Sequence, residues 1–107
     1  MYGTGYSLKV NTAVEKCAKK IRQTAGAYQS DGNLIAAKRS VDLALSELAN
    51  LYCKQPDLQI INWGKLLLSL ESYYNPCSDK RWLTVIKYAR AKACARRADR
   101  LYKLKIE

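Results

Sequence analysis

The chain has 107 residues, 49% of them apolar and 26% charged, so it can bury the core of one folded domain. Its formal net charge of +10 favours anionic partners. It contains no His, no adjacent carboxylates and no glycine-rich phosphate loop, so the usual general base and the commonest metal ligand are excluded. We therefore expect no enzyme, no catalytic residue, no cofactor and no metal site.

The first eleven residues contain two Gly and two Tyr without helical periodicity, and they predict a flexible arm over residues 1–11. Thr12 and Glu15 then form a Thr-x-x-Glu capping pattern, which indicates the start of a helix over about residues 12–29. The apolar residues of that helix repeat on one face: Val14, Cys17, Ala18, Ile21, Ala25 and Tyr28.

Ser30–Asn33 is a run of turn-forming residues, and a second helix is expected over about residues 34–53. Its apolar face consists of Leu34, Ala37, Val41, Leu45, Leu48 and Tyr52, widened by Ala44 and Leu51. Two such helices joined by a short turn form an antiparallel αα-hairpin.

Small and apolar residues in this hairpin have a recognisable spacing, at Ala25, Tyr28, Gly32, Ala37, Val41, Ala44 and Leu45. The spacing resembles a single hairpin of the tetratricopeptide family, and the resemblance implies two tightly packed helices. One repeat of about 34 residues further on, Asn62 and Glu71 stand where Tyr28 and Ala37 would recur. The resemblance is therefore confined to this one hairpin.

A third helix is expected over about residues 58–74, with Asp57 as its N-cap. More than half of its circumference is apolar, at Ile60, Ile61, Trp63, Leu66, Leu67, Leu68, Leu70 and Tyr73 or Tyr74. Such a helix is either the most buried one of a bundle or carries a surface for a partner, and we favour the first alternative.

Asn75–Ser78 breaks the third helix, and Ser78 or Asp79 caps a last helix over about residues 79–105. Its first half has a core face made of Trp82, Val85, Ile86, Ala89 and Ala93. The same face continues as Arg96 and Arg100, whose unpaired burial would be costly. We therefore expect the second half to leave the bundle near Cys94, or to pack through a stripe of Tyr88, Ala91, Ala95, Ala98 and Tyr102.

These elements predict an all-α fold, a small four-helix bundle built on an N-terminal antiparallel αα-hairpin, with a long basic C-terminal helix. Residues 1–107 are expected to form a single helical domain.

The four cysteines are Cys17, Cys53, Cys77 and Cys94, and none belongs to a C-x-x-C pair. We expect buried, reduced thiols that pack as small apolar groups, ahead of two disulfides or a four-thiolate metal site. Residues 1–10 lack a secretory signal, and no apolar run approaches the roughly 20 residues of a membrane span. A cytoplasmic, reducing location without a membrane partner is therefore expected.

Positive charge is concentrated at the C-terminus, where residues 79–107 hold ten of the 19 basic and three of the nine acidic residues. Lys92, Arg96, Arg100 and Lys103 lie at i, i+4, i+8 and i+11, on one helical face. Their spacing of roughly 6 Å is close to that of phosphates along a nucleic acid backbone. Arg90 and Arg97 lie on a neighbouring face. The alternative is a solvated face that only complements the helix dipole.

The pattern predicts a small basic protein that binds nucleic acid, RNA in preference to DNA, through the phosphate backbone. The predicted contact residues are Arg90, Lys92, Arg96, Arg97, Arg100, Lys103, Lys80 and Arg81. A loose helix-turn-helix, with Lys80, Arg81 and Thr84 at base edges, is a DNA-binding variant of this hypothesis.

The alternative function is a protein-interaction adaptor, or a small subunit of a larger ribonucleoprotein, viral or phage assembly. It would dock a partner or a second copy through the apolar third helix and the Tyr88–Tyr102 stripe. Membrane-surface binding is the weakest hypothesis, because the basic helix carries Ala where a membrane helix has larger apolar residues.

Overall fold

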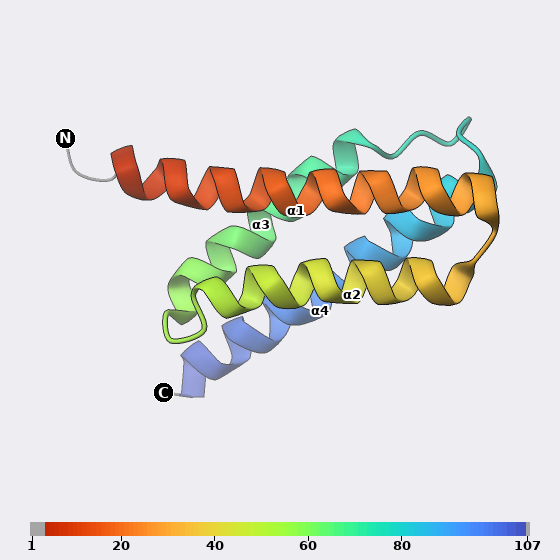
Figure 1. Ribbon diagram of the computed structural model, residues 1–107. Helices are drawn as coiled ribbons and strands as arrows, with labels where there is room; N and C mark the ends of the chain where they lie inside the picture. The colour runs from red at the N-terminus through yellow and green to blue at the C-terminus, as the bar shows by residue number, and fades with distance from the viewer. Residues whose placement is uncertain (1–3, 107) are drawn as a thin grey trace.

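The computed structural model describes the backbone of residues 4–106 and the side chains of residues 11–105, and every regular element in that part is a helix. The helices are α1 (Thr4–Asp31), α2 (Leu34–Leu51), α3 (Pro56–Ser72) and α4 (Lys80–Ile106). In Figure 1, α1 and α2 run antiparallel, and a second antiparallel pair, α3 and α4, crosses them. The predicted all-α four-helix bundle, with its N-terminal αα-hairpin, is confirmed.

α1 begins at Thr4, so the predicted arm over residues 1–11 is wrong from Thr4 onward, and residues 1–3 lie outside the described part. Thr12 lies within α1 and cannot be its N-cap, because a cap needs non-helical backbone at that residue. No Pro lies between Thr4 and Thr12 to interrupt the backbone hydrogen bonds. The capping pattern was therefore overridden by continuation of the helix toward the N-terminus.

The turn between α1 and α2 follows directly from its residues. Gly32 has a φ of +69°, a left-handed conformation that favours glycine, and its N–H donates to the carbonyl of Tyr28 at 2.8 Å. Asn33 is the N-cap of α2, and its side-chain oxygen accepts from the N–H of Ala36 at 3.1 Å. One residue therefore ends α1 and the next begins α2, which fixes the hairpin.

The starts of α3 and α4 are capped differently. α3 begins with Pro56 at its first position, so Gln55 is the N-cap and Asp57 lies within the first turn. The expectation that Asp57 is the N-cap is therefore wrong, although its carboxylate still complements the helix dipole. At α4, Asp79 accepts from the N–H of Arg81 at 2.8 Å, as one of the two predicted caps.

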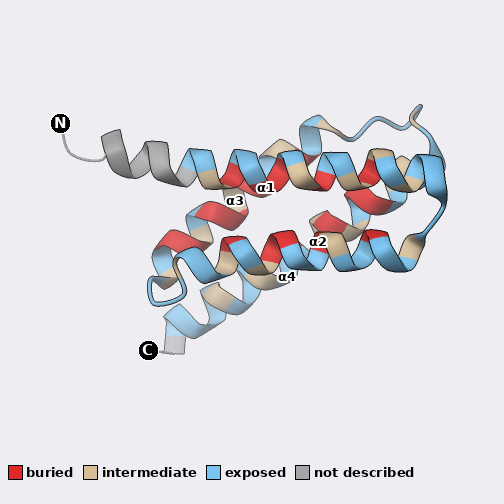
Figure 2. Cartoon of the chain, in the orientation of Figure 1, coloured by how far each residue is buried: buried red, intermediate tan, exposed pale blue. Residues whose placement is uncertain are grey.

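The core lies between the four helices, whose buried faces point inward in Figure 2. Ile21, Ala25, Val41 and Leu45, from the predicted apolar faces of α1 and α2, are fully buried. α1 and α4 each pack against all three other helices, whereas α3 packs mainly against α4 and α1. Six of the 17 residues of α3 are nevertheless buried, the largest share of any helix in the described part of the chain. The expectation that the third helix is the most buried is therefore confirmed, although its apolar residues Ile61 and Leu68 face solvent.

Asn62 is a buried polar residue of α3 whose amide has no hydrogen-bond partner among the described residues. Leaving such a group unpaired costs about 1–3 kcal/mol, and Leu has a similar size without polar atoms. We expect Asn62→Leu to raise the free energy of unfolding by about 1 kcal/mol or more. Urea denaturation checks this, and a loss of stability would indicate that the Asn62 amide is paired.

Candidate nucleic-acid interface

The second half of α4 packs through the face that carries Arg96. Its guanidinium carbon lies 5.6 Å from the ring centroid of Trp63 on α3, and its Nη2 donates to Ser46 Oγ of α2 at 3.4 Å. An aromatic face attracts a guanidinium, and the aliphatic stem of Arg tolerates apolar surroundings. Arg96 is therefore half-buried and keeps α4 in contact with α2 and α3 beyond Cys94. Ala93 is nevertheless the last buried residue in the described part of α4, and residues 101–105 are exposed, so the end of the helix does leave the bundle.

The alternative packing stripe is not used. Ala91, Ala95 and Ala98 are exposed, and Tyr102 keeps 64% of its surface accessible. Tyr88 is the half-buried member at the start of the stripe. The prediction that α4 packs through these residues is therefore wrong.

Tyr88 connects α4 to α2. Its hydroxyl donates to the carboxylate of Asp42 at 2.9 Å, and the ammonium groups of Lys38 and Lys92 lie 5.4 and 5.6 Å from its ring centroid. Desolvation and the hydrogen bond to Asp42 raise the pKa of Tyr88 above its usual value, so the hydroxyl stays protonated and keeps donating. The ring therefore holds lysines from two helices on one surface.

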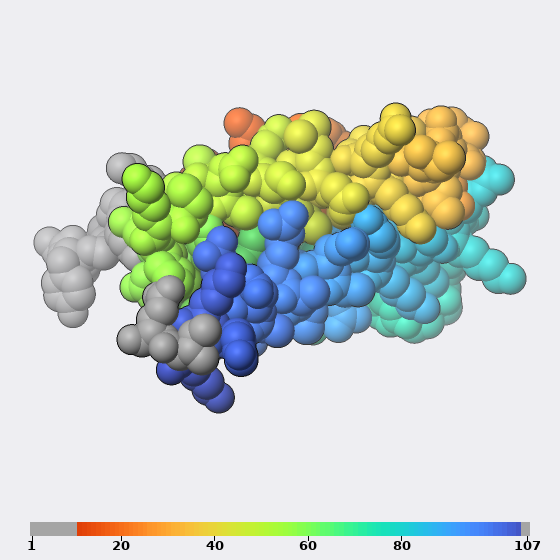
Figure 3. All heavy atoms as spheres, turned by 90° about the horizontal axis from the view of Figure 1, so that it is seen from below, coloured from red at the N-terminus to blue at the C-terminus, as the bar shows by residue number. Residues whose placement is uncertain are grey.

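α2 and α4 lie side by side on one face of the molecule (Figure 3). Lys38 and Lys92 meet there over the Tyr88 ring, Arg96 contacts Ser46 of α2, and Arg100 follows Arg96 one turn later on α4. We call these four basic residues the basic row: Lys38 of α2 with Lys92, Arg96 and Arg100 of α4. None of them belongs to an ion pair within the described part of the chain. Two carboxylates are close to the row, but Asp42 accepts from Tyr88 and Asp99 pairs with Lys103. Their charge is therefore available to an anion.

The other predicted residues of the second half of α4 lie in different surroundings. Arg90 is half-buried and pairs with Glu71 of α3 at 3.4 Å, and Lys103 pairs with Asp99 one turn away, also at 3.4 Å. Arg97 is exposed and its Nε lies against Gly64 of α3. Two of the three charges are therefore already compensated.

Lys80 and Arg81 lie at the opposite end of α4, about 22 Å from Arg96 at 1.5 Å per residue. Arg81 packs over the ring of Tyr28 at 5.8 Å and donates to the carbonyl of Gln29 at 3.3 Å. It therefore pairs with a free carbonyl in the last turn of α1 and complements the dipole of that helix. These residues and the basic row do not form one site.

Lys38 was missed by sequence reasoning. It stands in the middle of the chain, where residues 34–78 carry four basic and four acidic residues, so no local charge excess marks it. Only the packing of α2 against α4 brings it to Lys92.

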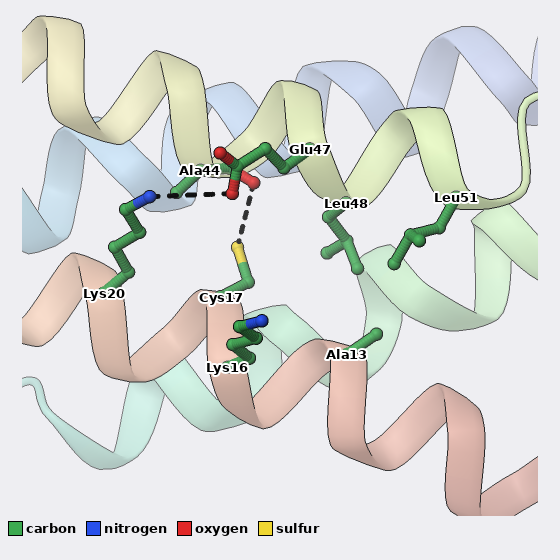
Figure 4. Close-up of a pocket in the computed structure, with 8 residues that line it drawn as sticks. All are labelled: Ala13, Lys16, Cys17, Lys20, Ala44, Glu47, Leu48 and Leu51. Carbon is green, nitrogen blue, oxygen red and sulfur yellow. Dashed lines mark hydrogen bonds and ion pairs between the residues drawn. The ribbon is translucent and has the colours of Figure 1, made fainter.

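Cys17 lines a pocket of about 190 Å³ between α1 and α2, which Figure 4 shows with the Lys20–Glu47 ion pair at 3.6 Å. Its thiol donates to the carbonyl of Ala44 at 3.6 Å. Burial, followed by the nearby Glu47 carboxylate, raises the pKa of Cys17 to about 12. A thiol that stays protonated is a poor nucleophile, so the structure does not favour Cys17 as a reactive group.

The other three cysteines, Cys53, Cys77 and Cys94, are exposed, so the expectation of buried thiols is wrong for all but Cys17. Cys53 and Cys77 follow the ends of α2 and α3, and Cys94 lies on the outer face of α4. Within residues 11–105, no cluster of three or more His, Cys, Asp or Glu side chains is arranged to hold a metal ion.

We expect three thiols of the native protein to react rapidly with an aromatic disulfide reagent at about pH 8, and Cys17 to react only on unfolding. The Cys17→Ala variant should keep the rapid phase and lose the slow one. Four equally rapid thiols would contradict this assignment.

The buried Cys17 thiol also makes stability depend on pH. Because the native pKa of Cys17 is raised from 9.0 to about 12, the thiol of the unfolded state loses its proton first. The free energy of unfolding should therefore fall as the pH rises above about 9, and denaturation at several pH values measures this.

None of the helices within residues 4–106 combines the length and the hydropathy needed to span a bilayer. Comparisons of the chain with protein-family models, with curated proteins and with solved structures give no match. The functional residues are therefore inferred from the geometry of this chain alone.

Proposed function

We propose that the protein binds nucleic acid, RNA in preference to DNA, by laying the basic row against a phosphate backbone. The observation that carries this proposal is the set of cations from α2 and α4 that share one face without ion-pair partners among the described residues. Each cation that meets a phosphate releases condensed counterions, so affinity comes from charge and not from base sequence. The positive net charge of +10 steers the encounter.

The preference for RNA rests on the lack of a free base-reading element in the part of the chain that the structure describes. In the helix-turn-helix variant, Arg81 would have to reach base edges, but its guanidinium contacts Tyr28 and Gln29. The hydroxyl of Thr84 donates to the carbonyl of Lys80 within α4. Backbone and shape recognition, which is usual for RNA, therefore fits this chain better than reading a DNA groove.

A cytoplasmic location is part of this proposal. Three exposed cysteines are maintained as thiols most readily in a reducing compartment.

The proposal is tested by fluorescence anisotropy with labelled single-stranded RNA, double-stranded RNA and duplex DNA at several salt concentrations. Four phosphate contacts predict a slope of log K against log salt of about −3 to −4. We expect micromolar or tighter binding at about 0.15 M salt, strongest for one of the two RNAs. Absence of binding to all three polymers at low salt would refute the function.

A second candidate function, self-association or docking to a protein partner, is favoured by one observation. Ile61 and Leu68 lie seven residues apart on α3 with 44% and 68% of their surfaces exposed, and Tyr102 on α4 is also exposed. Sedimentation equilibrium tests it: a mass above that of the monomer that Tyr102→Asp or Leu68→Asp reduces would support docking. A monomeric mass at high concentration would count against self-association.

A further inference from the structure

A pocket of about 320 Å³ lies beneath the basic row, between α3 and the second half of α4. Its lining residues from α4 are Lys92, Ala95, Arg96, Asp99 and Arg100, and those from α3 are Gln59 and Trp63. In Figure 3, atoms of α3 are visible in the depression between α2 and α4. The volume is at the lower end of the range for small-molecule sites, roughly 300–1,000 Å³.

Gln59 places a fixed hydrogen-bond acceptor at this pocket. Its side chain is 1% exposed, and its Nε2 donates to the carbonyl of Ala49 on α2 at 2.6 Å. That bond fixes the amide, because the reversed orientation would set two oxygens against each other. Oε1 is left without a partner among the described residues. Buried polar atoms are nearly always paired, so this oxygen calls for a donor.

Trp63 supplies the complementary donor. The side chain is 1% exposed, and its indole Nε1–H also has no partner among the described residues. Gln59 and Trp63 lie four residues apart on α3, one turn of the same face, and both line the pocket. Both atoms are buried beneath the pocket lining, so a ligand reaches them only when side chains over them, such as Arg96 on the Trp63 ring, move aside. A ligand that satisfies both must carry a donor and an acceptor, as the edge of a nucleobase does.

The charge at the pocket calls for an anion as well. Three cations line it against one carboxylate, Asp99, which is paired with Lys103. A small inorganic anion held by the cations could not also reach both Gln59 and Trp63, which lie one helical turn, about 6 Å, apart along α3. A ligand with both an anionic group and a polar planar ring satisfies the whole lining.

We infer that this pocket binds one unpaired nucleoside 5′-phosphate, with its phosphate against Lys92 and Arg100 and its base edge against Gln59 and Trp63. Arg96, which covers the Trp63 ring, offers its planar guanidinium to the base. The nucleotide is either free or part of a bound single strand. The second source rests on the proposed function, in which the same cations contact a backbone.

The test uses the fluorescence of Trp63 in a Trp82→Phe parent, because Trp63 and Trp82 are the two tryptophans of the chain. Uridine or adenosine 5′-monophosphate should change the emission saturably, and inorganic phosphate at equal concentration should not. The Gln59→Leu variant should lower nucleotide affinity at least tenfold. Asn62→Leu is the matched control, because Asn62 is buried on the same helix but does not line the pocket. Its affinity should be unchanged.

Circular dichroism establishes that each variant is folded. If Gln59→Leu loses helicity, Arg100→Gln, whose side chain is only half-buried, tests the phosphate contact by the same tenfold criterion. Equal responses to nucleotide and inorganic phosphate, or unchanged affinity in a folded Gln59→Leu, would overturn the proposal. The unpaired atoms would then be satisfied by water.

A short single-stranded RNA separates the two proposals. If RNA binds with a steep salt slope but neither mononucleotide alters Trp63, the pocket assignment falls and the backbone function stands. If a mononucleotide binds but no polymer does, the pocket assignment stands for a free nucleotide and the backbone function falls. Stronger binding of single-stranded than of double-stranded RNA, lost in Gln59→Leu, supports a nucleotide held within a strand.

Discussion

Replacing Leu45 with Ala is expected to lower the free energy of unfolding by about 2–5 kcal/mol. Leu45 is fully buried on α2, in the core shared with α1 and α4. Truncation removes apolar contacts and leaves a cavity that the surrounding helices fill only partly. Because a domain of this size is stable by roughly 5–15 kcal/mol, the loss is a large part of the total. Guanidinium denaturation followed by circular dichroism measures it.

Leu43→Ala is the matched control, because it makes the same chemical change two residues away on α2. Leu43 is 54% exposed, and its replacement should change the free energy of unfolding by less than about 0.5 kcal/mol. Equal losses at Leu43 and Leu45 would mean that α2 does not present the face seen here to the core. An unchanged slope of stability against denaturant in both variants would keep the comparison valid.

The N-terminal hairpin was predictable because its information is local. Ile21 and Val41 belong to apolar faces with a clear helical period, and Gly32 and Asn33 have the residue types that end and begin helices. The start of α1 was not predictable from Thr12, because a capping pattern does not exclude a helix that continues through it.

The burial of α3 and α4 depended on information that the sequence does not hold locally. The apolar pattern does not show which face of α3 is buried, because most of the circumference of that helix is apolar. The expectation that the face carrying Arg96 would not pack was wrong, because the Trp63 ring of another helix is a partner for its half-buried guanidinium. The exposure of Cys53 likewise depends on where α2 ends, and the exposure of Cys94 depends on which face of α4 packs against the other helices.

The candidate site was predictable in part for the same reason. Lys92, Arg96 and Arg100 share a face through helical spacing alone. Lys38 joins them only because α2 packs on α4, and Arg90 and Lys103 are compensated by acidic residues. The role of Gln59 was hidden because an unpaired buried atom is a property of the folded state.

The double variant Lys92→Gln with Arg100→Gln is expected to weaken RNA binding at physiological salt about tenfold or more, since it removes two of the four phosphate contacts. For the same reason the slope of log K against log salt should become shallower by about 1.4–1.8. These residues are preferable to Arg96, because Arg96 covers Trp63 and its loss would also disturb packing. Neither residue belongs to an ion pair among the described residues, so the fold should persist. Salt titration by anisotropy measures both effects.

The control for this variant is Lys16→Gln with Lys19→Gln, which removes the same charge from exposed positions on α1. If binding is steered only by the net charge of +10, the two double variants should lose affinity equally. If the basic row contacts phosphates, only the α4 variant should lose slope, because counterion release counts direct contacts and not distant charge. Equal flattening of the salt slope in both variants would therefore mean that RNA is attracted by the net charge of the whole protein. A loss of slope confined to the α4 variant would mean that RNA contacts the face shared by α2 and α4.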